Sequence, residues 1–371
     1  MALLAPGGRL RILVVNAGSS SLKLRVVNQE DEVVHSADMP AIGRGSGLEE
    51  IGSALADWGE IDGVGHRIVH GGSVFARPVI VDEEVVKELT RLVDLAPLHQ
   101  PMSLAALEAV TAGLPEIPAV ACFDTSFHAD LPPAAATYPL PREWRERWGL
   151  RRYGFHGLSH SYAAARGAEL MGRSLDATRI VTCHLGAGAS LAAIRNGRSV
   201  DTTMGFTPLE GLMMATRSGS IDPGLLLWLA NTVGMSGADL AKGLEEQSGL
   251  LGLAGSADMR EVLAASEAGS TEARLALDVY LHRLRTGIAS MAASLGGLEG
   301  LVFTGGVGEN SPIIREWAVE GLHYLGMVID PEKNREHSGD RVVSPPHTPV
   351  QLVVVASRED LQIAREVRRL L

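Results

Sequence analysis

Cysteine is almost absent from this sequence. Its 371 residues include two cysteines, Cys122 and Cys183, and neither belongs to a CxxC pair. Each lies late in an apolar segment, so we expect two buried free thiols rather than a disulfide or a metal cluster. Free thiols of this kind predict a reducing compartment.

Long apolar runs and basic runs are also missing. No stretch reaches the ~18–20 apolar residues that a membrane-spanning helix needs. The first segment, MALLAPGGRLR, lacks the apolar core and cleavage site of a signal peptide. The net charge of −11 excludes nucleic acid as the main partner, because no Lys/Arg run is present to neutralise phosphates in bulk. We therefore expect a cytoplasmic protein with no nucleic-acid partner and no membrane.

Two common nucleotide-binding motifs are absent as well. Neither GxxxxGK[ST] nor a GxGxxG after a strand occurs, which argues against P-loop and dinucleotide-binding folds. The pairs His66/His70 and His156/His160 have i,i+4 spacing but lack the glutamate of HExxH. This spacing therefore gives little support to a zinc site.

What the sequence does contain is a repeated hairpin. RILVVNAGSSSLKLRVV, residues 11–27, predicts strands Ile12–Val15 and Leu22–Val27 around a small, hydroxyl-rich turn. Alone, such a turn is typical of an ordinary hairpin, although its backbone N–H groups also suit an anion. A shift of 168 positions leads to RIVTCHLGAGASLAAIR, residues 179–195, which again reads as strand, glycine-rich turn and strand. Two such copies predict a duplicated domain with a cleft between the copies.

Strands and helices alternate along the rest of the chain, which predicts an α/β fold with mixed sheets flanked by helices. The further strands that we expect are Glu32–Ser36, one in Gly63–Gly72, Ala119–Phe123, Ser199–Thr203, Gly300–Thr304 and Val350–Val355. The expected helices are Leu48–Trp58, Glu83–Leu95, Pro101–Thr111, one from Tyr153–His160 to Met171, Ser270–Leu295, and others starting at Pro223, at Ser311-Pro312 and after Ser357.

Several local details are predicted within these elements. In the long helix, one face is expected to form core through Leu275, Val279, Leu284, Ile288, Met291 and Leu295. Gly305–Gly308 is expected to be a glycine-rich turn, and Ser311-Pro312 has the N-cap and first-turn pattern of the next helix. Ser357 and Asp360 resemble a capping box at the last helix.

The polar motifs favour phosphate chemistry. Glycine-rich turns follow strands at Gly18, Gly186–Gly188 and Gly305–Gly308, and Arg67, Arg217 and Lys23 supply cations. Phosphoryl transfer needs alignment, a metal ion and cations around the moving group. The ends of strands in α/β sheets are where ligands usually bind.

Taken together, the motifs resemble those of acetate kinases, in the superfamily of acetate and sugar kinases, Hsp70 and actin. The resemblance runs almost end to end through NAGSSSLK, GHRIVHGG, LAPLH, FDTSFH, YGFHGLSH, CHLGAGAS, MGFTPLEGLMMATRSGSIDP, GGVGEN and SREDLQIARE. It implies two duplicated ribonuclease-H-like domains with the active site in the cleft between them. An acyl-substrate domain would comprise residues 1–127 and 360–371, and a nucleotide-binding domain residues 128–359.

The resemblance also implies a reaction and its site. Acetate and ATP would give acetyl phosphate and ADP reversibly, with Mg²⁺ or Mn²⁺, in a homodimer. The implied catalytic residues are Arg67, Asp124, His156 and Arg217, and the implied metal ligands are Asn16 and Glu359. The implied substrate contacts are Arg67, Val69, Leu98, His99, Phe155 and Pro208. The implied nucleotide contacts are Lys23, His184, Leu185, Gly186, Ala187, Gly188, Asp258, Met259, Arg260, Gly306, Val307, Gly308, Glu309 and Asn310.

Physical reasoning assigns some of these roles independently. A carboxylate nucleophile is already ionised at neutral pH and needs no general base, so we expect Asp124 to position Mg²⁺ or its waters. The guanidinium groups of Arg67 and Arg217 suit a carboxylate or a planar phosphoryl group. Structural alternatives exist for Glu359, as an acidic residue in a first helical turn, and for Asp258, as a helix cap.

Two departures from the family pattern stand out. Ala187 replaces the usual asparagine of HLGNG, and Ala189 often corresponds to serine, so a side-chain amide is lost while the glycines stay. The segment before Gly63 is also short for the family. Propionate or butyrate kinase is an alternative that differs only in the acyl pocket, and a non-catalytic nucleotide-binding switch on the same fold is another.

Overall fold

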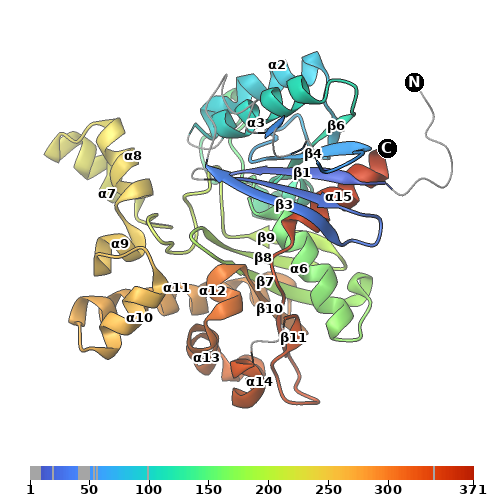
Figure 1. Ribbon diagram of the computed structural model, residues 1–371. Coiled ribbons are helices and arrows are strands. Elements are labelled where there is room, and N and C mark those ends of the chain that lie inside the picture. The colour runs from blue at the N-terminus through green and yellow to red at the C-terminus, as the bar shows by residue number, and fades with distance from the viewer. Residues whose placement is uncertain are drawn as a thin grey trace. The chain divides into compact units, whose positions relative to one another are not determined.

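The computed structural model describes residues 10–18, 21–40, 51–52, 55, 57–97, 100–336 and 339–371. The chain divides into two compact units, whose helices and strands are labelled in Figure 1. Unit 1 comprises Met1–Ala129 and Arg358–Leu371, and unit 2 comprises Asp130–Ser357. Most of the expected helix Leu48–Trp58 lies outside the described residues, as do Leu98 and His99.

Unit 1 is built on a six-stranded sheet of order β3-β2-β1-β4-β6-β5. Its strands are β1 (Ile12–Ala17), β2 (Ser21–Val27), β3 (Val33–Pro40), β4 (Gly63–Ile68), β5 (Val79–Ile80) and β6 (Ala119–Phe123). Its helices are α2 (Glu83–Arg91), η1 (Leu92–Leu95), α3 (Gln100–Gly113), η2 (Ser126–His128) and α15 (Glu359–Leu370). The expected helix Glu83–Leu95 thus continues as a 3₁₀ turn beyond Arg91.

Unit 2 repeats this sheet in the order β9-β8-β7-β10-β12-β11. Its strands are β7 (Arg179–Leu185), β8 (Ala189–Arg195), β9 (Arg198–Thr202), β10 (Gly300–Thr304), β11 (Arg341–Val342) and β12 (Gln351–Val354). In both sheets the first three strands are antiparallel, the next two join in parallel, and the short edge strand is antiparallel. The predicted α/β class and the predicted duplication are therefore confirmed.

The helices of unit 2 are more numerous. They are α4 (Pro133–Ala136), α5 (Arg142–Trp148), α6 (Gly157–Leu170), η3 (Leu175–Ala177), α7 (Pro223–Trp228), the π-helix η4 (Leu229–Val233), α8 (Gly237–Glu246), α9 (Gly249–Ala254), α10 (Met259–Glu267), α11 (Thr271–Leu295), α12 (Gly305–Asn310), α13 (Pro312–Glu320), η5 (His323–Leu325) and α14 (Pro331–Arg335). None of the described helices is long and apolar enough to cross a bilayer.

Strand β4 shows how the sequence determines the packing in unit 1. Alternate side chains of a strand point to opposite faces. A Cβ on Gly65 would lie 2.4 Å from Ile363 of α15, so only glycine lets this helix lie close to the sheet. Val64 faces the other way, into the apolar cluster that includes Val110 of α3. Arg67 therefore shares the α15 face, whereas His66 shares the α3 face.

Helix α11 corrects the expected core stripe. Leu275 is 55% exposed, because the buried face of the first turns is formed by Ala276, Leu277 and Tyr280. A prediction from the spacing of large aliphatic residues leaves out alanine and tyrosine, which form much of the buried face here. From Leu284 onward the expected residues are buried.

Of the two expected helix starts, the one at Ser311-Pro312 has the expected position, whereas the capping box at Ser357 and Asp360 is wrong. Ser311 is the N-cap residue of α13 and Pro312 begins that helix, as expected, but the Ser311 hydroxyl makes no capping hydrogen bond and has no partner among the described residues. The segment before it is a short helix, α12, where a glycine-rich turn was expected. Helix α15 begins at Glu359 without a side-chain cap, and Asp360 instead accepts a hydrogen bond from Arg358 at 2.9 Å. The backbone N–H of Ser357 donates a hydrogen bond to the side chain of Glu309.

Candidate functional site

Four polar side chains meet at one edge of the unit 1 sheet. Arg67 donates to both carboxylate oxygens of Asp124, from Nε at 3.0 Å and Nη2 at 2.6 Å. Its Nη1 donates to Asn16 Oδ1 at 3.2 Å. Asn16 Nδ2 in turn donates to Glu359 Oε2 at 3.1 Å. These residues come from the ends of β1 and β4, the residue after β6, and the start of α15, so strand ends and one helix start assemble the cluster.

The charges in this cluster are strongly coupled. Burial alone would lower the pKa of the Arg67 guanidinium, but the carboxylates of Asp124 and Glu359 raise it above its ordinary value. Burial raises the pKa of Asp124, whereas the charge of Arg67 opposes that shift and the charge of Glu359 adds to it. Arg67 therefore stays charged and holds the nearly buried Asp124 carboxyl in one orientation.

The cluster has the donor chemistry that Mg²⁺ prefers. Asn16, Asp124 and Glu359 all present oxygen atoms, and Mg²⁺ binds proteins through one or two carboxylates while keeping several waters. The residues therefore fit a magnesium ion. Across the described residues, no group of three or more His, Cys, Asp or Glu side chains has the arrangement of a metal site.

Other expected contacts in unit 1 lie nearby. Lys23 stands directly opposite Asn16 in the register of β2 and β1, so the two side chains share a face. Lys23 is exposed, and Val69 is buried just beyond β4. The expected substrate contacts Leu98 and His99 lie outside the described residues.

Unit 2 contains a cavity of about 860 Å³. Three separate segments of the expected nucleotide site line it: Gly186 and Ala187 after β7, Asp258–Arg260 at α10, and Gly306, Val307 and Asn310 of α12. Apolar residues supply most of the remaining wall, among them Leu250, Leu263, Tyr280 and Ile313. A cavity of this size with apolar walls and a glycine turn suits a nucleoside with its phosphates at the turn.

Besides Lys23 of unit 1, five expected nucleotide contacts do not line this cavity. They are His184, Leu185, Gly188, Gly308 and Glu309. Conversely, sequence reasoning missed Leu250, Leu263, Tyr280 and Ile313. Only Ile313 carried a signal, since it is the third residue after GGVGEN, whereas the other three are typical of ordinary apolar helix positions.

Asp258 is a helix cap, which was the structural alternative to nucleotide binding for this residue. Its side chain accepts a hydrogen bond from Arg260 N at 2.8 Å and so caps α10. The side chain of Arg260 also bonds to it and lowers the pKa of the exposed Asp258 carboxyl to about 2. Asp258 thereby fixes both the helix start and Arg260 at the mouth of the cavity.

Three histidines form a linked group beside the glycine turn. His156 Nδ1 lies 2.8 Å from Ser190 Oγ, and the same hydroxyl lies 2.8 Å from His160 Nε2. His160 Nδ1 reaches Thr182 Oγ1 at 2.7 Å. The ring of His184 stacks on that of His156 with centroids 4.3 Å apart. His156 is therefore held in one orientation from two sides.

Arg217 approaches the same turn. Its Nη1 donates to Pro208 O at 3.0 Å. A Cβ on Gly188 would lie 3.2 Å from the His156 ring and 3.7 Å from Arg217 Nη1, so the turn, the histidine and the arginine surround one small space. Burial lowers the pKa of Arg217, and the charge of Glu245 opposes the shift. Phe155, which precedes His156 in the chain, is buried.

Comparisons with known proteins agree with this architecture. The model of the acetokinase family matches residues 46–365. An acetate kinase of Trichormus variabilis is 52% identical over 313 residues, which cover 84% of this chain and 77% of that protein. The crystal structure of Porphyromonas gingivalis acetate kinase has a TM-score of 0.89 and 36% identity, covering 97% of this chain and 99% of that one. A propionate kinase of Francisella tularensis has a TM-score of 0.90 and 33% identity, covering 98% and 100%.

Proposed function

The chain belongs to the acetokinase family and is a kinase, and from that premise we propose that it transfers the γ-phosphoryl group of ATP reversibly to acetate. The products are acetyl phosphate and ADP. The observation that carries this proposal is the cluster of Arg67, Asp124, Asn16 and Glu359, which combines a carboxylate-binding cation with oxygen ligands for a metal.

Arg67 binds the acetate carboxylate in this proposal. Its guanidinium is already oriented by Asp124, so little ordering remains when the substrate arrives. Acetate is ionised at neutral pH and attacks without a general base. The contacts that the family resemblance implies for its methyl group are Val69, Leu98, Phe155 and Pro208, with His99 as a further substrate contact.

Asn16 and Glu359 would hold Mg²⁺, and Asp124 would position the ion or its waters. When bound, the ion neutralises charge on the phosphate oxygens of ATP. Asp124 also orients Arg67, so the loss of the Asp124 charge would affect both the binding of acetate and the position of the metal ion at ATP. We therefore expect Asp124→Asn to lower turnover and to alter the Mg²⁺ dependence.

Arg217 and His156 act on the phosphoryl group as it moves. Both lie beside the glycine turn, where guanidinium and imidazole N–H groups can donate to its oxygens. The nucleotide occupies the unit 2 cavity, with its phosphates at the glycine turn that Gly186 and Ala187 contribute to the wall. The family resemblance implies Lys23 as a further cation.

Two other functions are candidates. Propionate or butyrate differs from acetate by one or two methylenes, each worth ~1–3 kcal/mol in an apolar pocket. The similarity to a propionate kinase favours including both in any assay. A nucleotide-binding switch would need no acyl pocket, and the oriented Arg67 speaks against it.

The assay is direct. Purified protein is incubated with Mg-ATP and formate, acetate, propionate or butyrate, and acyl phosphate is trapped with hydroxylamine. We expect the highest kcat/KM with acetate. Arg67→Ala should abolish hydroxamate formation while ATP still binds, and Arg91→Ala, on the exposed end of α2, is the matched control. A lack of hydroxamate from every acid would overturn the proposal.

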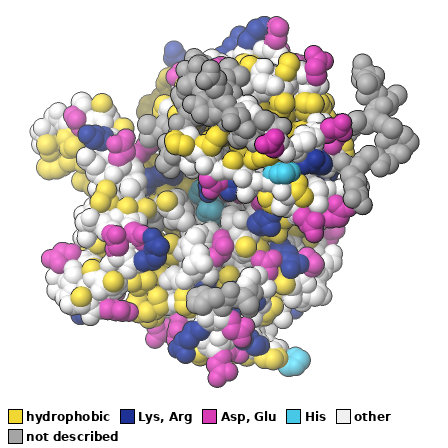
Figure 2. All heavy atoms as spheres, viewed as in Figure 1, with side chains coloured by type: hydrophobic (Ala, Val, Ile, Leu, Met, Phe, Trp, Pro, Cys, Tyr) yellow, Lys and Arg dark blue, Asp and Glu magenta, His cyan; other side chains and the backbone are white. Residues whose placement is uncertain are grey.

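We further propose a cytoplasmic homodimer. Cys122 and Cys183 are buried free thiols, as the reducing cytoplasm allows. Helix α7, η4 and α8 contain no buried residue, although Leu227 is 64% and Trp228 53% exposed. Figure 2 shows hydrophobic side chains on this lobe at the left of the view. A second copy of the chain would cover it, and Trp228→Glu should then shift the mass measured by light scattering to that of a monomer.

A further inference from the structure

Glu309 belongs to the GGVGEN segment but does not line the nucleotide cavity. Its neighbours Gly306, Val307 and Asn310 do. The Glu309 side chain instead accepts a hydrogen bond at Oε1 from the backbone N–H of Ser357, at 2.9 Å. The carboxylate is thus directed to the chain that leaves unit 2, two residues before Glu359.

The backbone beneath Glu309 is fixed by a buried arginine. Arg315 is fully buried, and its Nη1 donates to the carbonyl oxygens of Gly308 at 2.8 Å and Glu309 at 2.9 Å. Its Nε and Nη2 donate to Asn334. Burial, together with the charge of Arg341, lowers the pKa of Arg315 to about 10, so it remains charged at neutral pH. Arg315 therefore satisfies the last carbonyls of α12 and holds Glu309 in place.

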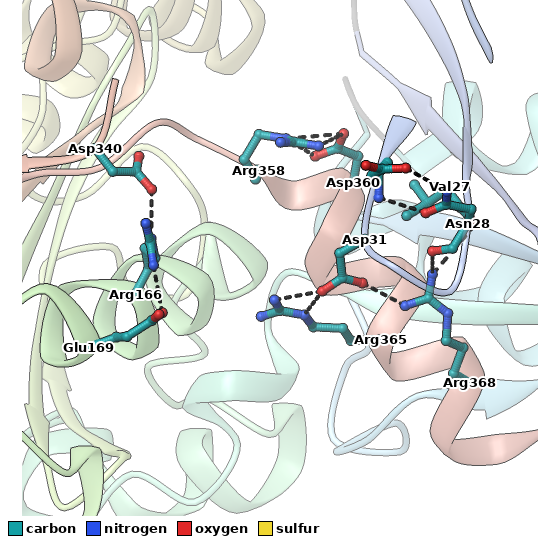
Figure 3. Close-up of polar contacts among 11 residues, drawn as sticks. Val27, Asn28, Asp31, Arg166, Glu169, Asp340, Arg358, Asp360, Arg365 and Arg368 are labelled. Atoms are coloured by element: carbon teal, nitrogen blue, oxygen red, sulfur yellow. Dashed lines mark hydrogen bonds and ion pairs between the residues drawn. The ribbon is translucent and has the colours of Figure 1, made fainter. Parts of the chain in front are cut away.

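Glu309 contacts the segment of residues 355–357, in which each backbone N–H donates a hydrogen bond. Val355 N donates to Phe303 O, and Ala356 N donates to Asp340 Oδ1 at 2.8 Å. Asp340 is itself held by Arg166, which also pairs with Glu169, as Figure 3 shows. Ser357 N completes the series through Glu309. Three consecutive amides are thus anchored in unit 2.

On the unit 1 side, the same chain becomes α15. Arg358 pairs with Asp360, and further along the helix Arg365 and Arg368 both pair with Asp31 (Figure 3). Glu359, the first residue of the helix, bonds to Asn16. The helix is therefore anchored along its length, and its first turn follows directly from the anchored amides.

We propose that Glu309 is a positioning residue that holds the chain at Ser357 and thereby fixes where Glu359 enters the active site. It is not a nucleotide ligand. The inference rests on the proposed function, since it takes Glu359 to act in phosphoryl transfer.

Three variants test the role of Glu309. Glu309→Ala removes the acceptor, Glu309→Gln keeps an acceptor oxygen without the charge, and Ser357→Ala keeps the backbone N–H as a matched control. Each is measured for kcat, for KM of ATP and of Mg²⁺, for the Kd of a fluorescent ADP analogue, and for hydrogen exchange at residues 355–361 without ligands.

We expect Glu309→Ala to lower kcat on the order of 10- to 100-fold, because small misplacements of a reacting group have effects of that size. The Kd of the ADP analogue should change less than about threefold, while the amide of Ser357 loses its protection. Glu309→Gln should retain most of both properties, and Ser357→Ala should match the wild type. Asp340→Ala, which frees the adjacent amide, should lower kcat in the same direction.

Other outcomes overturn the inference. Weaker ADP binding with normal kcat would make Glu309 a nucleotide ligand, and unchanged kcat and exchange would leave it without a positioning role. Failure of the proposed function is distinguishable, because the wild type would then form no hydroxamate. In that case the exchange at Ser357 still decides whether Glu309 holds the chain.

Discussion

Arg67 and Asp124 form a two-point pair in which Nε and Nη2 of the arginine reach both oxygens of the carboxylate. The side chain of Asp124 is 2% exposed and that of Arg67 17%. A buried carboxylate without a partner strongly lowers the free energy of unfolding, whereas removal of both charges together lowers it less.

Arg67→Ala should therefore destabilise the fold as well as abolish turnover. We expect a loss of about 3 kcal/mol in the free energy of unfolding, because Asp124 stays buried without its partner. The double variant Arg67→Met/Asp124→Leu should recover most of that loss and remain inactive. Urea unfolding and the hydroxamate assay measure the two effects. A single variant as stable as the wild type would contradict the prediction.

Ser190→Ala should slow the reaction without weakening nucleotide binding. The Ser190 hydroxyl lies between His156 and His160, and its loss frees the His156 ring to rotate. We expect kcat to fall on the order of tenfold, as for other losses of orientation. Thr182→Val, which removes the far partner of His160, should have a smaller effect. Wild-type kcat in Ser190→Ala would show that His156 is oriented by other contacts.

Gly65→Val should loosen α15. A Cβ at Gly65 would lie 2.4 Å from Ile363 and 2.8 Å from Val367, so the helix must move away from β4. We expect a loss of about 1–3 kcal/mol in the free energy of unfolding. Gly113→Ala, where an added Cβ meets nothing within 4 Å, is the control. Equal stability of both variants would argue against close packing of α15 on the sheet.

His66 should make the protein less stable in mild acid. Neither ring nitrogen has a hydrogen-bond partner among the described residues, and burial lowers the pKa of His66 to about 3. Below pH 6.5 the unfolded chain takes up a proton that the folded protein refuses, so stability falls as the pH falls toward 3. The expected contribution is about 1.4 kcal/mol per pH unit. In urea unfolding between pH 5 and 7, His66→Leu should show a shallower pH dependence than the wild type.

Ala187→Asn should strengthen nucleotide binding. Ala187 is exposed in the wall of the cavity, so an added amide meets no crowding and gains access to the ligand. A hydrogen bond to a charged group contributes about 1.5 kcal/mol, which corresponds to roughly tenfold in Kd. Ala189→Ser is the contrasting variant, because Ala189 is fully buried and a hydroxyl there faces no ligand. Titration with an ADP analogue compares them.

The strand positions were predictable because their signals are local. Ala119–Phe123 and Gly300–Thr304 are buried apolar segments followed by polar residues, and both agree with β6 and β10. Placing Asp124 at the end of a strand followed from the same pattern. The repeated turn similarly pointed to the duplicated sheets.

Side-chain direction was less accessible. Nothing in GGVGEN distinguishes Asn310, which lines the cavity, from Glu309, which reaches Ser357. That difference depends on the rotation of α12 about its axis. Arg315 fixes this rotation by donating to Gly308 O and Glu309 O, and Asn334 of α14 holds Arg315 in turn. Likewise Tyr280 reaches the cavity only because α11 is rotated away from its leucine stripe.

The helix that completes unit 1 is encoded after all of unit 2. During synthesis, the ribosome therefore releases β1 to β6 long before Ile363 and Val367 emerge to cover Gly63 and Gly65. Until then one face of that sheet lacks the helix that covers it. Unit 2, in contrast, has its entire chain once residue 357 has been synthesised. Unit 2 is thus the part that can fold first, and a nascent chain stalled before residue 358 would expose an apolar sheet face to chaperones.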